Sequence, residues 1–96
     1  MSPEDQERFN TLKIILRNRG IKLGRRHKHR KLYLVINGRK FLDYAADYQK
    51  RQILTILREQ IQEFWPDAYL TSASMPTGEF VFRANAQEKR GPKSNG

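Results

Sequence analysis

The sequence of 96 residues has no cysteine and no long apolar run. The absence of cysteine excludes disulfide bonds, thiolate nucleophiles and zinc sites that use cysteine. The longest apolar runs, such as Ile14-Ile15-Leu16, are far shorter than a bilayer span. The first ten residues are polar and acidic, unlike a secretory signal. We therefore expect a cytoplasmic protein without a membrane partner, associated with the nucleoid if its source is a bacterium or a phage.

Motifs for catalysis are also absent. The sequence has no glycine-rich phosphate loop, no HExxH and no nucleophile with a neighbouring histidine. His27 and His29 provide only two of the ligands that a metal site needs. Asp43 and Asp47 could hold magnesium, but aspartate at a helix start is more often a cap. We expect no enzyme, no cofactor, no metal and no small-molecule substrate.

Acidic residues are missing from one contiguous part of the chain. Residues 8–42 hold twelve Lys or Arg and no Asp or Glu, whereas residues 43–96 hold seven of each sign. The twelve positive charges of residues 8–42, less the three acids of residues 1–7, therefore give the whole net charge of +9. Charge concentrated in this way creates a directed field that attracts polyanions.

The densest part of this region is GRRHKHRK, residues 24–31, which precedes the strand-like run LYLVIN. We predict that it forms a basic β-hairpin arm that neutralises phosphates, with strand alternation placing Arg25, His27, His29 and Lys31 on one side. The candidate nucleic-acid-binding residues are Arg17, Arg19, Lys22, Arg25, Arg26, His27, Lys28, His29, Arg30, Lys31, Arg39 and Lys40. Aromatic side chains could add base stacking. Tyr33 and Phe41 are expected in the core, and Tyr44 and Tyr48 at a helix start are better candidates for exposure.

Two helices and two strand pairs are expected. A cap at Ser2, Pro3 in the first turn and a stop at Gly20 indicate the first helix. A second helix runs from Asp43 or Asp47 to Phe64, before Pro66. Residues 21–37 predict two strands and Asn37-Gly38 a tight turn. Residues 39–42 form either a short third strand or a segment that leads out of the sheet, and a final hairpin follows the second helix.

This pattern predicts an α+β fold, with two helices packed on one face of a four- to five-stranded antiparallel sheet, in the order α-β-β-(β)-α-β-β. Residues 1–85 would form a single domain and residues 86–96 a disordered basic tail. A weak internal repeat at a shift of 47 residues aligns residues 21–23 with 68–70, and residues 33–35 with 80–82. In this alignment GRRHKHRK corresponds to the uncharged turn segment TSASMPTG.

Two families have a similar order of elements. KLYLVINGRKFLDYA, followed by a helix, resembles the small DNA-binding domains that precede some tyrosine integrases, over residues 21–64. Residues 3–64 are similar in order to a double-stranded-RNA-binding domain, although its lysine-rich motif is absent. These resemblances imply binding of a nucleic-acid duplex, and neither identifies the chain as a family member.

The sequence therefore predicts a non-enzymatic nucleic-acid-binding protein, with DNA favoured over RNA and duplex DNA as the main candidate, in an accessory, architectural or regulatory role. The open alternatives are an RNA-binding or ribosome-associated factor, a protein-binding module or inhibitor that docks its basic arm on an acidic partner, and a solvated loop without a partner. The oligomeric state is not determined by the sequence.

Overall fold

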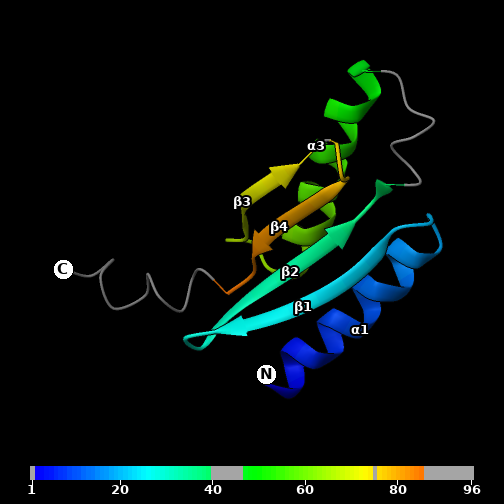
Figure 1. The fold of residues 1–96 in the computed structure, drawn as a ribbon. Helices are drawn as coiled ribbons and strands as arrows, with labels where there is room; N and C mark the ends of the chain where they lie inside the picture. Colours follow the sequence, from blue (N-terminus) through cyan, green and yellow to red (C-terminus); the bar gives the residue numbers. More distant parts are fainter. Residues whose placement is uncertain (1, 40–46, 75, 86–96) are drawn as a thin grey trace.

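The structure, a computed structural model, describes residues 2–39, 47–74 and 76–85, with the backbone alone for residues 47–50. The described elements follow the order helix, two strands, helix, two strands (Figure 1). Their bounds are α1 Pro3–Arg17, β1 Lys22–Lys28, β2 Lys31–Asn37, α3 Asp47–Phe64, β3 Tyr69–Ser74 and β4 Glu79–Arg83. The predicted α+β fold is confirmed. Phe41, Asp43, Tyr44 and the tail of residues 86–96 lie outside the described residues.

Local signals in the sequence fix both ends of α1. The Ser2 hydroxyl accepts a hydrogen bond from the backbone N–H of Asp5 at 3.1 Å, which caps the start. At the other end Gly20 has a φ of +76°, and its N–H donates to the Arg17 carbonyl at 2.9 Å. The Ile21 N–H donates to the Leu16 carbonyl at 3.0 Å, which completes a Schellman motif. The helix thus leads directly into β1.

The four strands form one antiparallel sheet in the order β1-β2-β4-β3. Each hairpin pairs its own two strands, and β2 pairs with β4 to join the hairpins. The described part of the chain therefore consists of two α-β-β halves that meet along the central strands. Among the described strands, β1 and β3 are the two edges of the sheet, and α1 runs alongside β1 (Figure 1).

Strand alternation divides the sheet into two faces. On the inner face, Leu34, Ile36, Phe80 and Phe82 are completely buried, and the buried stripes of α1 and α3 complete the same core. The opposite, outer face is polar or only half-buried at nearly every position. Both helices thus cover one face, and the outer face carries no described helix.

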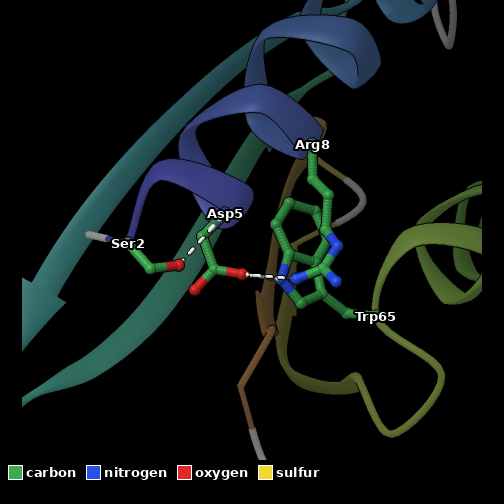
Figure 2. A network of polar contacts seen from close by, with 4 residues as sticks. All are labelled: Ser2, Asp5, Arg8 and Trp65. Atoms are coloured by element: carbon green, nitrogen blue, oxygen red, sulfur yellow. Dashed lines mark hydrogen bonds and ion pairs between the residues drawn. The ribbon is translucent and has the colours of Figure 1, made fainter.

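A buried polar contact joins the start of α1 to the end of α3 (Figure 2). The indole Nε1 of Trp65 donates to Oδ1 of Asp5 at 3.0 Å, and the Arg8 guanidinium contacts the same oxygen at 2.9 Å. Asp5 is 9% exposed and Trp65 5%. Because both groups are buried, this carboxylate satisfies a donor that would otherwise have no acceptor.

Several expectations from the sequence need correction. Asn37-Gly38 is not a hairpin turn: it ends β2, and the Gly38 N–H donates to the Gly78 carbonyl at 2.8 Å. Tyr33 is not in the core, because it lies half-buried on the outer face. Beyond Arg39, the expected third strand lies outside the described residues.

The internal repeat matches the structure only in part. At a shift of 47 residues β1 matches β3 in its facing, since Leu23 and Leu70 both point inward. It fails for β2 against β4, where the buried Leu34 would correspond to the outward Val81. β3 contains a register shift between Leu70 and Ser72, which moves the second hairpin out of step with the first.

Candidate nucleic-acid interface

Most of the predicted basic residues lie on the hairpin of β1 and β2. Its register places Lys28 opposite Lys31, so the turn consists of His29 and Arg30 alone. GRRHKHRK is therefore mainly strand rather than loop, and the segment TSASMPTG, with which the repeat aligned it, is strand over residues 71–74. Lys31 lies beyond the turn and shares the outer face with Lys28, so the predicted grouping of Lys31 with Arg25 and His27 is wrong.

The turn has an unusual backbone for its residues. His29 has φ +52° and Arg30 φ +64°, the left-handed values that a two-residue type I′ turn requires at both positions. Asn-Gly is the preferred sequence for this turn, because a Cβ is disfavoured in this region. The hairpin thus holds two non-glycine residues, one of them an exposed cation, in a costly conformation.

Arg25 is held against α1. Its guanidinium lies over the Phe9 ring, with Cζ 5.0 Å from the ring centroid, and its Nη1 donates to Oε1 of Gln6 at 2.7 Å. This contact fixes the direction of one positive charge on the side of β1 that faces the helices. Arg25 therefore contributes to packing as well as to charge.

The side of β1 that faces away from the helices carries every second residue of the strand. Lys22, Gly24, Arg26 and Lys28 lie on the outer face, and all four are exposed. Successive members are about 6.7 Å apart along a strand, from a rise of ~3.3–3.4 Å per residue. Arg26 and Lys28 are therefore neighbouring cations about 6.7 Å apart, whereas Gly24 carries no charge and separates them from Lys22.

The predicted site divides into two groups. Lys22 is opposite Asn37, whose side-chain oxygen accepts from the Arg39 N–H at 3.1 Å. Lys22 and Arg39 therefore lie at the far end of the hairpin from its turn, about 20 Å away along β1. Arg17 and Arg19, at the end of α1, belong to this far group, and Lys40 lies outside the described residues.

The hairpin belongs to the sheet and does not project from it as the sequence suggested. β2 pairs with β4 over residues 33–37, and Asn85 extends the contact to the turn. Its amide donates to the Arg30 carbonyl at 3.2 Å, and its Oδ1 accepts from the Leu32 N–H at 2.8 Å. The basic residues are thus presented on a supported surface rather than on a free arm.

The positive charge of this surface is not neutralised within the described part of the chain. Over residues 2–39, 47–74 and 76–85, the ion pair found joins Arg8 to Asp5, away from the hairpin turn. Arg25 contacts an amide and an aromatic ring, neither of which is charged. The field of the hairpin therefore remains available to an external anion.

Sequence reasoning missed a second feature of the outer face. The pairing registers place Arg26 opposite Tyr33, Tyr33 opposite Arg83, and Arg83 opposite Tyr69. These four residues, the Arg/Tyr row, cross the whole sheet. Arg83 is only 4% exposed. Alternation alone assigns Tyr33 and Arg83 to the outward side of their strands, but their adjacency depends on pairing between residues 50 positions apart.

Other classes of site find no support in the described residues. No group of three or more His, Asp or Glu side chains there could hold a metal ion. None of the helices described is long and apolar enough to span a bilayer. The order of the strands, with β4 next to β2, also differs from the three consecutive strands of the two resembled families. No protein-family model, curated protein or solved structure matches this chain.

Proposed function

We propose that this protein binds nucleic acid through the hairpin of β1 and β2, with duplex DNA as the main target and without catalysing a reaction. The hairpin and the far group of cations would contact phosphates along one strand. Contacts of this kind position a protein on nucleic acid but do not read its sequence. The role that follows is accessory or architectural.

The observation that carries this proposal is the difference between the two halves of the fold. β3, the counterpart of β1, reads YLTSAS and contains no charged residue, yet it forms the other edge of the same sheet. β1 reads KLGRRHK. Since both strands form an edge of the same sheet, the fixed charges of Arg26, Lys28, Arg30 and Lys31 exceed what this fold requires.

The charges of the hairpin are also arranged at a cost to stability. Lys28 and Lys31 stand directly opposite each other beside the turn, and like charges in this position destabilise a strand pair. A phosphate between two such cations would convert repulsion into attraction. An isolated hairpin gains nothing from this pairing, which favours a polyanionic partner.

The test is a salt series of binding measurements with a triple variant, Arg26→Gln, Lys28→Gln and Arg30→Gln. Each phosphate contact contributes about 0.9 to the slope of log K against log salt on duplex DNA. Loss of three contacts should therefore flatten the slope by about 2.7. Arg25 is left in place, because its contacts with Phe9 and Gln6 would mix stability with binding.

The matched control removes three exposed charges from the helices, with Lys13→Gln, Arg51→Gln and Arg58→Gln. Both variants lower the net charge from +9 by three, so a difference between them reports position rather than total charge. Equal slopes for the two variants would contradict the hairpin as the binding surface. The proposal is wrong if the wild-type protein binds neither duplex DNA nor structured RNA at low salt. Tighter binding to RNA than to duplex DNA at matched salt would support the RNA-binding alternative instead.

A further inference from the structure

The outer face of the sheet is partly apolar and carries no described helix. Between the Arg/Tyr row and the far group of cations lies a second row, made of Gly24, Val35, Val81 and Ser72. Val35 and Val81 are half-buried. Gly24 has no side chain, so the edge of this row is shallow. The middle of the face thus presents an apolar floor of two valines beside a glycine.

Cations and aromatic rings border this floor. Tyr69 is 46% exposed and Tyr33 is half-buried, and Arg26 and Lys28 stand beside them on β1. Tyrosine rings and small apolar side chains accept the flat surfaces of nucleobases, while arginine and lysine accept the phosphates that connect them. Paired bases are stacked inside a duplex and cannot lie on such a floor, so the matching ligand is an unpaired strand.

Arg83 provides an independent indication of an anionic ligand. The residue is 4% exposed, and in the pairing register it lies between Tyr33 on β2 and Tyr69 on β3. Its Nε is buried without a hydrogen-bond partner, and no hydrogen bond or ion pair joins its guanidinium to any residue in the described ranges. A buried cation without a counter-charge is costly. A phosphate or a base carbonyl at the surface of the row would provide the missing acceptor.

We propose that the outer face of the sheet binds a single-stranded segment of nucleic acid, with bases on Tyr33 and Tyr69 and over the valine floor, and a phosphate or base oxygen on Arg83. This inference rests on the proposed function and deepens it. The hairpin edge contacts a duplex, and the outer face contacts an unpaired strand. Arg26 and Lys28 lie at the border of both surfaces, so nucleic acid with a junction between paired and unpaired regions could engage the two together.

The test compares the full chain on an oligothymidylate and an oligouridylate of about 12 nucleotides, within the site size of small single-strand binders, and on a duplex of equal length. Tyr33→Leu should weaken binding to the single strands by about tenfold, the loss of one stacked base, and leave duplex binding within about twofold. Tyr33→Phe keeps the ring and should bind as the wild type does. Ile14→Ala, an exposed truncation on α1, should change neither.

Arg83→Met separates a ligand role from a structural role. If Arg83 serves a ligand, removal of an unpaired buried charge should leave the melting temperature unchanged or raise it, whereas single-strand affinity should fall by about tenfold or more, as for a hydrogen bond to a charged group. A lower melting temperature with unchanged affinity would assign Arg83 to the fold.

The inference fails if Tyr33→Leu and a Tyr69→Leu variant both bind single strands as the wild type does. If the wild type binds duplex DNA but no single strand, the inference about the outer face is wrong and the proposed function of the hairpin is not affected. Failure to bind any of the nucleic acids ends both.

Discussion

Replacement of the turn residues should stabilise the protein and weaken its binding at the same time. The hairpin places His29 at φ +52° and Arg30 at φ +64°. A left-handed conformation costs an L-amino acid about 1–2 kcal/mol, less for His than for Arg. Arg30→Gly removes this cost, and the greater freedom of glycine in the unfolded chain offsets about 0.5–1 kcal/mol of the gain.

The net gain for Arg30→Gly is thus about 0.5–1 kcal/mol, from the difference of these two terms. For a domain of this size, 1 kcal/mol moves the melting temperature by about 4–8 °C, so we expect a rise of about 2–8 °C. Addition of His29→Asn produces the preferred Asn-Gly turn and should raise it further. The hydrogen bond from Asn85 is retained, because it ends on the backbone carbonyl of residue 30.

The matched variant is Arg30→Ala, which loses the same charge but keeps a Cβ and hence the strain. Thermal unfolding should separate the two variants, with only the glycine variant more stable than the wild type. Salt-series binding should not separate them, because each loses one phosphate contact and about 0.9 of slope on duplex DNA. If glycine melts no higher than alanine, the turn is not strained; if both keep the wild-type slope, Arg30 does not touch a phosphate.

Two further predictions concern the fold. Asp5→Ala leaves the buried indole N–H of Trp65 without its acceptor and should lower the free energy of unfolding by about 1–3 kcal/mol, whereas Asp5→Asn keeps an oxygen there and should lower it less. Urea unfolding, followed by the fluorescence of Trp65, the one tryptophan of the chain, measures both variants. Equal losses of stability would assign the effect to the charge of Asp5. Gly20→Ala and Gly78→Ala both place a Cβ at positive φ, but only at Gly78 would this Cβ lie 2.6 Å from backbone atoms of Arg39. Gly78→Ala should therefore lower the melting temperature more than Gly20→Ala does, and a smaller effect at Gly78 would contradict the close approach.

The features that could be predicted from the sequence are those with local causes. The Ser2 cap and the Gly20 stop depend on residues within one helical turn of them. The strand from Lys31 to Asn37 shows its buried side by alternation. The fold class followed from the order of these elements.

The errors arose where distant or unusual pairing decided the outcome. The preferred turn sequence Asn37-Gly38 occurs at the end of β2, where the N–H of Gly38 pairs with Gly78 and no hairpin closes. The actual turn uses His29-Arg30, a sequence that carries no such signal. The Arg/Tyr row depends on the register between β2 and β4, which is set by contacts across the sheet and cannot be read from either strand alone.

The basic residues of β1 have a second possible explanation, since charged side chains also protect an edge strand from pairing with other chains. Protection does not depend on the sign of the charge, whereas binding to phosphate does. Lys28→Glu uses this difference: it keeps an edge charge and turns the like-charged pair with Lys31 into an attractive one, which should stabilise by about 0.2–1 kcal/mol. The variant should remain as monodisperse as the wild type in size-exclusion chromatography, melt at the same temperature or higher, and lose more affinity for duplex DNA than Lys28→Gln does. Unchanged affinity would leave edge protection as the sufficient reason for this lysine.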